Sequence, residues 1–363
     1  MTAAPVRFGI VGSGWRSDSF LRISREAPSL FEVAGLVSRS AGTRAATEAA
    51  WGVPGFAHVD ELVDVTRPEF VVLSVPRTVV PGIVEHLVDR GVPVLTETPP
   101  AIDLGAAEEL FRRVAGRGVV QVAEQYHRSP VLAAQLAIAR SGRLGTVSQA
   151  MVAQCHDYHG VSVLRRALGV RGEAAIITAS VFESPLVAGP DRTGDPVEER
   201  IVTARQLTAR FDFGDRLGIY DFAPEQYFSW IRANRLLVRG DRGEIRDGEV
   251  RSLESFDHPV VEELRRVSTG EGGNLEGMFL RGIQLGAEWV FANPFMPSRL
   301  NDDEIAIASM LLGMREHIGG GPDVYSLAEA SQDLYLALVM KEAAATGAPV
   351  RTSPRAWADA LAG

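Results

Sequence analysis

The chain has 363 residues, more than one hydrophobic core usually organises, so about two domains are expected. Its 37 basic and 46 acidic residues give a formal net charge of -9, which argues against non-specific binding to nucleic acid or anionic membranes. The single cysteine, Cys155, cannot form an internal disulfide, and neither a signal-peptide pattern nor a long apolar span is found, so we expect a cytoplasmic protein.

The first third of the chain alternates short apolar strands with helices. Strands are expected at Val6–Val11, Phe31–Val37, Phe70–Val75, Val92–Leu95 and Val119–Ala123, and helices at Trp15–Arg25, Arg44–Trp51, Val79–Asp89 and Leu104–Val114. Strands this uniformly apolar are typical of a parallel sheet covered on both faces. The pattern predicts a doubly wound, Rossmann-type α/β domain over residues 1–125.

A glycine-rich turn links the first strand to the first helix. It reads Gly12-Ser13-Gly14-Trp15-Arg16, and Ser17 occupies the third small position. Backbone N–H groups at the start of a helix that follows such a turn can bind a pyrophosphate. We therefore expect this turn to bind a dinucleotide.

The second strand ends without the acidic residue that usually binds the ribose of NAD. Its end reads Ser38-Arg39-Ser40 instead. Hydroxyls and a guanidinium suit a 2′-phosphate, so NADP(H) is favoured over NAD(H). The alternative is that Arg39 is a solvated loop residue.

Beyond residue 125 the pattern changes to consecutive strands with short turns. Strands are expected at Val147–Gln154, Ala174–Phe182, Ile201–Phe213, Arg216–Phe222 and Leu236–Val238, a loop at Pro185–Pro196, and helices at Val131–Arg140, Asp302–His317 and Ser326–Thr346. Hairpins of this kind predict an α+β domain, predominantly antiparallel, over residues 126–363.

Four stretches carry a resemblance to the Gfo/Idh/MocA oxidoreductases, the glucose-fructose oxidoreductase and inositol dehydrogenase family. They are GIVGSG at Gly9–Gly14, PVLTETP at Pro93–Pro99, HGVSVLRRALG at His159–Gly169 and SLAEASQDLYLALVMKEAAATGAPV at Ser326–Val350. The resemblance implies a Rossmann domain, a second domain with a large open sheet, a sugar or polyol substrate, and a homodimer or homotetramer.

The resemblance also assigns residues to the cofactor. Glu97 matches the family glutamate beside the nicotinamide ribose, and Thr98 stands where relatives carry a lysine. We expect Thr98 to position substrate or nicotinamide by hydrogen bonding. The end of the third strand, Ser74, Val75 and Pro76, is expected to contact the cofactor as well.

The catalytic pattern of the family is only half kept. Its histidine falls on His159, its two aspartates on Cys155 and Ser162, and its glycine on Asp157. An imidazole can take a hydroxyl proton near neutral pH, so His159 is the expected acid–base residue. The alternative for His159 is a histidine that only caps the following helix.

Four further residues complete the expected site. Tyr126 is assigned to catalysis, and His127, Arg128 and Tyr158 to substrate binding; a cap between the domains is the alternative for residues 126–128. Arg165 and Arg166 are expected on a solvated helix face. Cys155, His156 and His159 fit no strong zinc pattern, so no metal is expected.

Three functions remain open from the sequence. The first is an NAD(P)-dependent dehydrogenase or reductase that transfers hydride between the cofactor and a sugar, polyol or related carbonyl or secondary alcohol. The second is an enzyme that retains its cofactor and uses transient oxidation to drive elimination, epimerisation or glycoside cleavage. The third is a non-catalytic dinucleotide or sugar sensor.

Overall fold

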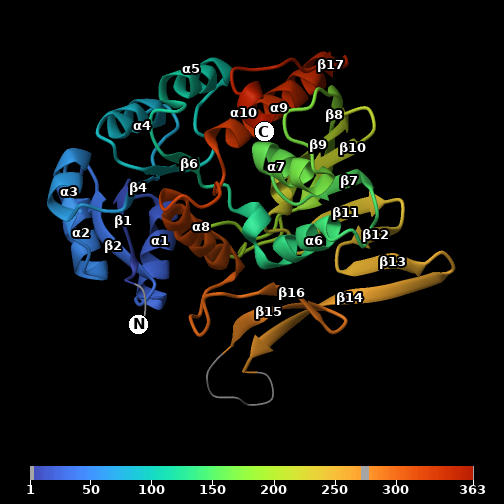
Figure 1. Cartoon of the computed structure of the whole chain (residues 1–363), viewed down its shortest axis with the longest axis horizontal. Coiled ribbons are helices and arrows are strands. Elements are labelled where there is room, and N and C mark those ends of the chain that lie inside the picture. Colours follow the sequence, from blue (N-terminus) through green and yellow to red (C-terminus); the bar gives the residue numbers. More distant parts are fainter. Residues whose placement is uncertain (1–3, 271–277, 363) are drawn as a thin grey trace. The chain divides into compact units, whose positions relative to one another are not determined.

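A computed structural model describes residues 4–270 and 278–362 (Figure 1). The chain divides into two compact units, each made of several segments. The first unit comprises residues 1–130, 267–282 and 292–331, and the second comprises residues 131–266, 283–291 and 332–363. Each unit is described separately below.

The first unit contains a six-stranded parallel sheet. Its strands are β1 (Val6–Val11), β2 (Phe31–Val37), β3 (Gly55–Phe56), β4 (Phe70–Leu73), β5 (Val94–Thr96) and β6 (Val120–Val122). The order β3-β2-β1-β4-β5-β6 reverses direction between β1 and β4, as in a doubly wound sheet. The predicted Rossmann fold is therefore confirmed.

Helices cover both faces of this sheet. They are α1 (Trp15–Glu26), α2 (Ala41–Trp51), α3 (Val59–Thr66), α4 (Val80–Asp89) and α5 (Leu104–Val114), with α8 (Asp302–Ile318) and the 3-10 turn η1 (Tyr126–Arg128) in the same unit. Strand β3 and helix α3 were not predicted, because β3 has only two residues and α3 only eight. Leu62 of α3 is nevertheless fully buried in the core.

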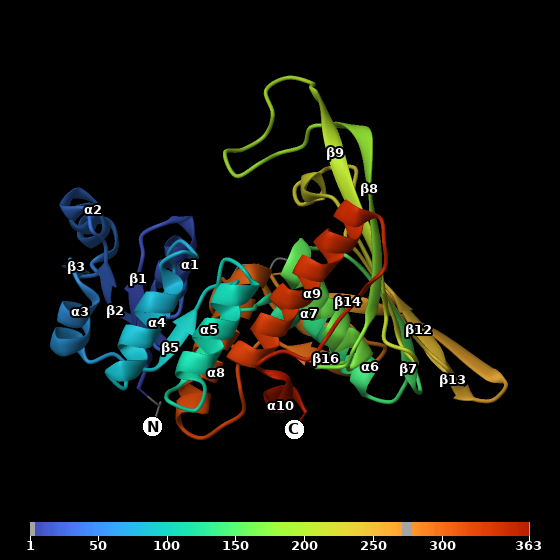
Figure 2. The ribbon, with the colours of Figure 1, turned by 90° about the horizontal axis from the view of Figure 1, so that it is seen from above.

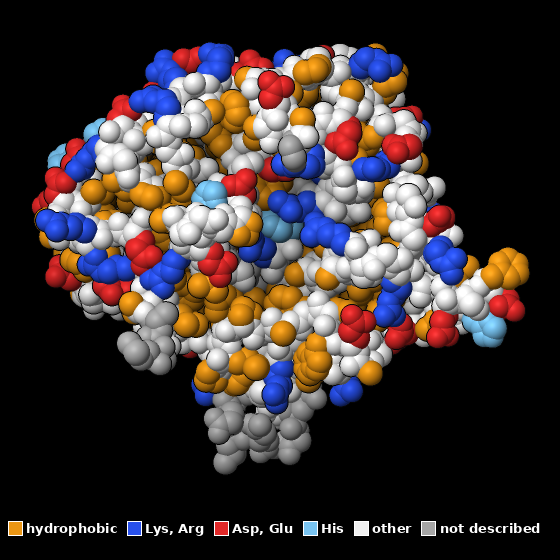
Figure 3. Space-filling view, viewed as in Figure 1, with side chains coloured by type: hydrophobic (Ala, Val, Ile, Leu, Met, Phe, Trp, Pro, Cys, Tyr) orange, Lys and Arg blue, Asp and Glu red, His pale blue; other side chains and the backbone are white. Residues whose placement is uncertain are grey.

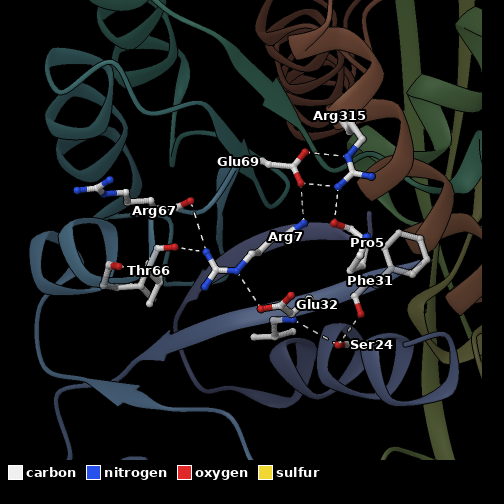
Figure 4. A network of polar contacts seen from close by, with 11 residues as sticks. Pro5, Arg7, Ser24, Phe31, Glu32, Thr66, Arg67, Glu69 and Arg315 are labelled. Atoms are coloured by element: carbon white, nitrogen blue, oxygen red, sulfur yellow. Dashed lines mark hydrogen bonds and ion pairs between the residues drawn. The ribbon is translucent and has the colours of Figure 1, made fainter. Parts of the chain in front are cut away.

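A network of hydrogen bonds and ion pairs lies at the edge of the sheet where β1 begins (Figure 4). The backbone N–H of Arg7 donates to Glu69 Oε1 at 2.9 Å, and Arg315 Nε of α8 donates to Glu69 Oε2 at 2.8 Å. Arg7 Nε also donates to Glu32 of β2 at 2.9 Å. Burial would raise the pKa of Glu69, but the bonds from Arg315 and Arg7 outweigh it and lower that pKa. Glu69 thus joins β1 to α8 as a carboxylate.

The second unit is built on an eleven-stranded mixed sheet. Its strands are β7 (Val147–Ala153), β8 (Ile176–Val187), β9 (Ile201–Asp212), β10 (Leu217–Phe222), β11 (Arg235–Gly240), β12 (Gly243–Arg246), β13 (Glu249–Ser255), β14 (His258–Thr269), β15 (Phe279–Leu285), β16 (Glu288–Ala292) and β17 (Val350–Arg351). The order is β16-β15-β14-β13-β12-β11-β7-β10-β9-β8-β17, in which β7 and β10 form a parallel pair. The predicted large, mostly antiparallel sheet is confirmed.

Strand β8 is longer than its sequence indicated. Pro185 and Val187 were expected in a loop, but they pair with Thr203 and Ile201 of β9. Proline is tolerated there because a strand near the sheet edge need not use every N–H in a ladder. The loop therefore begins three residues later.

Three helices pack on one face of this sheet, as Figure 2 shows: α6 (Pro130–Arg140), α7 (Asp157–Leu168) and α9 (Leu327–Thr346). Short elements, η2 (Pro224–Gln226) and α10 (Ala358–Leu361), complete the unit. Arg165 of α7 was expected in solvent, but it is only 1 % exposed and its Nη1 lies 2.6 Å from Asp333 Oδ1 of α9. The expectation was wrong because its carboxylate partner is 168 residues away in sequence.

The molecular surface is mixed in charge. Basic and acidic side chains are interspersed over the face in Figure 3, in keeping with the net charge of -9. Among the helices of the described residues, none is both long and apolar enough to cross a membrane.

Candidate functional site

The glycine-rich turn lies at the carboxyl edge of the parallel sheet, between β1 and α1. Gly12 has a φ of 116°, and a Cβ added there would lie 2.0 Å from the carbonyl oxygen of Ser74. Only glycine fits, because both the backbone conformation and the close approach exclude a side chain. Ser17 Oγ donates to the carbonyl of Gly12 at 3.0 Å and fixes the turn from within α1.

Gly14 differs from Gly12 in having no steric reason within the chain to be glycine. Its backbone is extended, with φ -83° and ψ 175°, and a Cβ added there would meet no atom within 4 Å. The space in front of Gly14 lies at the N-terminus of α1, where backbone N–H groups and the helix dipole favour a phosphate. These features fit a dinucleotide pyrophosphate.

The end of β2 lies beside this turn. Ser13 Oγ and Ser38 Oγ are 3.2 Å apart, and Ser40 Oγ accepts from Thr43 N as the N-cap of α2. The Arg39 side chain is exposed, and the described residues include no hydrogen-bond partner for its guanidinium. The guanidinium of Arg39 is therefore a solvent-facing positive charge at the end of β2.

Arg44 is a second guanidinium at this edge that sequence reasoning did not single out. Its Nη1 donates to the carbonyl oxygens of Ser38 at 2.7 Å and Arg39 at 3.1 Å. Arg44 therefore holds the backbone that carries Arg39. No sequence pattern pointed to this role, because Arg44 is simply the fourth residue of α2.

The ends of β4 and β5 continue the same edge. Ser74 N donates to the carbonyl of Val11 at 2.8 Å, and Glu97 N donates to the carbonyl of Leu73 at 2.9 Å. Val75 is partly buried and Pro76 is exposed just beyond β4. The predicted cofactor residues of β1, β4 and β5 therefore share one edge of one sheet.

The Arg16 side chain links α1 to the end of β5 at this edge. Its Nε donates to Glu97 Oε1 at 2.8 Å, and its Nη1 lies 3.6 Å from Asp303 Oδ2 of α8. Burial would lower the pKa of Arg16, but the charge and hydrogen bond of Glu97, with Asp303 and Tyr126, raise it on balance. Arg16 therefore stays charged, whereas Thr98, next to Glu97, carries no charge.

The turn η1 follows β6 in the same unit. Tyr126 N donates to Glu124 Oε1 at 3.2 Å, and the Tyr126 phenol contributes, after Glu97 and Asp303, to the raised pKa of Arg16. The His127 ring lies 5.4 Å from that of Tyr325, and Arg128 Nη2 donates to the carbonyl of Val324 at 3.1 Å. Tyr126 thus interacts with the Arg16 guanidinium. His127 and Arg128 instead contact Tyr325 and Val324, in the segment that precedes α9.

The second unit carries the remaining predicted residues at the N-terminus of α7. His156, Tyr158 and His159 form a cluster of rings, with centroids 5.0 Å apart for the two histidines and 4.4 Å apart for Tyr158 and His159. His159 is 7 % exposed, whereas His156 is only partly buried. Cys155 is fully buried, and Ser162 Oγ donates to the carbonyl of His159 at 2.9 Å.

Tyr227 was not predicted, although its phenol joins this cluster. Its oxygen accepts from the backbone N–H of His156 at 2.9 Å and lies 2.7 Å from His156 Nδ1. The Tyr227 phenol therefore ties the start of α7 to the segment that follows η2. No local sequence pattern links Tyr227 to α7.

Asp157 has the left-handed φ of 45°, which explains why the resembling pattern has glycine at this position. Its Oδ2 lies 2.7 Å from Nζ of Lys341, the only lysine of the chain. The ion pair joins α7 to α9 beside the histidines. Within the described ranges, no group of three or more His, Cys, Asp or Glu side chains is arranged to hold a metal ion.

Known proteins share this architecture. Residues 6–126 match the oxidoreductase family with an NAD-binding Rossmann fold. An uncharacterised oxidoreductase of Schizosaccharomyces pombe is 30% identical over 151 residues, which are 40% of this chain and 41% of that protein, so the match spans about two fifths of the relative.

Two solved structures have the same fold over nearly the whole chain. An oxidoreductase of Agrobacterium radiobacter in complex with NAD+, L-tartaric acid and magnesium has a TM-score of 0.67 at 15% identity, covering 96% of this chain and 98% of that one. Levoglucosan dehydrogenase in complex with NADH and levoglucosan has a TM-score of 0.68 at 14% identity, covering 96% and 100%. The dinucleotide-binding domain is therefore similar to the oxidoreductase family with an NAD-binding Rossmann fold, and the two-domain fold is shared with both solved structures.

Proposed function

We propose that this protein is an NAD(P)-dependent oxidoreductase that transfers hydride between the nicotinamide and a sugar, polyol or related carbonyl or secondary alcohol. The observation that carries the proposal is the turn Gly12–Gly14, where one glycine is required by the fold and the other leaves space at the start of α1. The levoglucosan and tartaric acid bound by the two similar structures support a small polyhydroxylated substrate.

NADP(H) is the proposed preferred cofactor. Arg39 is exposed at the end of β2, and Arg44 holds its backbone. A guanidinium bonded to a phosphate typically contributes about 1.5–3 kcal/mol, so Arg39→Asp should lower the NADPH-over-NADH preference about 10- to 100-fold or more. Arg117→Asp makes the same charge change three residues beyond α5, where Arg117 is exposed and pairs with Asp89, and should leave the preference unchanged. Equal loss in both variants would contradict the role of Arg39.

The proposed chemistry gives each predicted site residue a separate task. When bound, the nicotinamide supplies or accepts the hydride. His159 takes the hydroxyl proton in the oxidation direction and returns it in reduction, and Thr98 and Tyr126 position the reacting group by hydrogen bonding. His127, Arg128 and Tyr158 are the proposed substrate-binding residues. Loss of a general base typically lowers the rate by about 10²- to 10⁴-fold.

A screen of sugars, polyols and their carbonyl forms, followed at the absorbance of the reduced nicotinamide, tests the function. Continuous turnover supports it, product without net turnover indicates the cofactor-retaining reaction, and binding alone indicates a sensor. On a substrate that turns over, His159→Ala should lose activity with unchanged cofactor affinity. His258→Ala, which removes an exposed histidine of β14, is the matched control.

We also propose a homodimer or homotetramer formed through the large sheet. The face opposite α6, α7 and α9 carries charged ladders such as Arg239–Glu244, and apolar side chains such as Leu237 between them. A surface with both charges and apolar side chains can pair with a second copy of itself. Light scattering on the purified protein distinguishes a monomer from a dimer or tetramer.

A further inference from the structure

Beside the end of β5, the positive charge at the carboxyl edge of the parallel sheet comes from Arg16. Position 98 supplies only a hydroxyl, and Arg16 is 8 % exposed with its Nε bonded to Glu97 at 2.8 Å. Asp303 approaches the other side of the guanidinium at 3.6 Å. Two carboxylates on one guanidinium fix its orientation more firmly than a single surface ion pair would.

The hydrogen bond from Arg16 to Glu97 also shows which half of the sheet edge the guanidinium occupies. Arg16 begins on α1, which follows β1, and its partner lies at the end of β5, beyond β4. Dinucleotides bind across the point where the strand order reverses, here between β1 and β4. Because β2 bears the groups that suit the adenosine ribose, the guanidinium lies on the half that remains for the nicotinamide.

One donor of this guanidinium has no protein acceptor. Among the described residues, Nη2 of Arg16 is buried and forms no hydrogen bond. A buried charged donor left without an acceptor is costly, typically by more than an ordinary hydrogen bond contributes. The position of Nη2 therefore indicates that a bound group accepts its proton.

The charges around Nη2 restrict which group that is. One guanidinium with the carboxylates of Glu97 and Asp303 carries a net charge of about -1, which disfavours a further phosphate or carboxylate. An uncharged carbonyl oxygen is the better acceptor. On the nicotinamide half of the cofactor, the carboxamide is the group that carries such an oxygen.

We propose that Arg16 Nη2 donates a hydrogen bond to the carboxamide oxygen of the nicotinamide, and that Glu97 and Asp303 hold the guanidinium in place for it. This inference rests on the proposed cofactor. It makes Arg16 a positioning residue that fixes the rotation of the nicotinamide ring, and so determines which ring face is presented to the substrate.

Binding titrations with NADPH and with its thionicotinamide analogue test the contact without any substrate. Sulfur is the weaker acceptor, so the wild type should bind the oxygen form more tightly. Arg16→Met, which removes the donor and keeps the length, should weaken NADPH binding about 10- to 100-fold and abolish the preference for oxygen over sulfur.

Arg22→Met is the matched control, because Arg22 also lies on α1 and its Nε is bonded to Glu304 at 2.7 Å, outside the proposed site. It should bind both nucleotides as the wild type does. Arg16→Lys provides a second variant if Arg16→Met does not fold, and it should also lose most of the preference because the ammonium is shorter and not planar.

The outcomes separate the inference from the proposed function. Undiminished NADPH binding by Arg16→Met, or an equal loss for both nucleotides, would overturn the contact with the carboxamide oxygen. Failure of the wild type to bind either nucleotide would instead overturn the proposed cofactor itself.

Discussion

Substituting the two glycines of the turn separates the needs of the fold from those of the cofactor. In Gly12→Ala the new Cβ would lie 2.0 Å from the Ser74 carbonyl oxygen, whereas real Cβ contacts essentially never fall below 3.0 Å. The φ of 116° adds backbone strain. A disfavoured backbone costs about 1–2 kcal/mol and a forced contact about 1–3 kcal/mol, so Gly12→Ala should destabilise the protein by about 2–5 kcal/mol.

Gly14→Ala should behave differently. The backbone there suits alanine and the new methyl group meets no protein atom within 4 Å, so stability should change by less than about 1 kcal/mol. The same methyl group would occupy the space proposed for the pyrophosphate, and we expect at least a tenfold loss of NADPH affinity.

Urea denaturation followed by tryptophan fluorescence gives the stabilities, and calorimetric titration with NADPH gives the affinities. Gly14→Ala is the informative variant, because its free energy of unfolding should stay near that of the wild type while its affinity for NADPH falls. Wild-type NADPH affinity in Gly14→Ala would refute the placement of the pyrophosphate at α1. Wild-type stability in Gly12→Ala would refute the claim that the Ser74 carbonyl leaves no room for a side chain at position 12.

Three further predictions concern other parts of the molecule. Asp333→Ala removes the carboxylate beside the buried Arg165 guanidinium, so urea denaturation should show a loss of about 3–5 kcal/mol, which removal of the charge in Arg165→Met with Asp333→Leu should largely recover. Glu69→Gln should cost about 1 kcal/mol at neutral pH, allowing for partial exposure. Because folding lowers the pKa of Glu69, that difference should be present above the unfolded-state value of about 4.3 and disappear as the pH falls through the folded value, as measured by denaturation at several pH values. Tyr227→Phe removes the oxygen that accepts from the backbone N–H of His156, so urea denaturation should show a loss of about 1–3 kcal/mol, and unchanged stability would argue against this bond holding the start of α7.

Much of the fold follows from local patterns in the sequence. The parallel sheet of the first unit was predictable because each apolar strand is followed by a helix and by turn residues. The strands that became β8 and β9 were also predicted, but Pro185 obscured the end of β8 because a proline usually marks a loop. In the second half, strands β13 and β14 are partly exposed and rich in charge, so their alternation is a weak signal.

Site residues could be predicted only where a short sequence motif contains them. The glycine turn and Glu97 stood out because their chemistry is local, and the structure places them at one sheet edge. Asp303 joins that edge from α8, and Tyr227 reaches His156 from beyond β10; both contacts arise from tertiary packing between segments far apart in sequence. The same packing buries Arg165, whose position on an amphipathic helix gave no sign of its partner.

Transfer of isotopic label from the cofactor tests the central claim most directly. NADPH with deuterium in place of both hydrogens at C4 of the nicotinamide is incubated with the protein and the carbonyl form of the substrate found in the screen, and the product is analysed by mass spectrometry. Direct hydride transfer predicts one deuterium on the carbon of the newly formed alcohol for each NADPH consumed. Product that carries no deuterium, or consumption of NADPH without a reduced product, would contradict the assignment of this protein as an NAD(P)-dependent oxidoreductase.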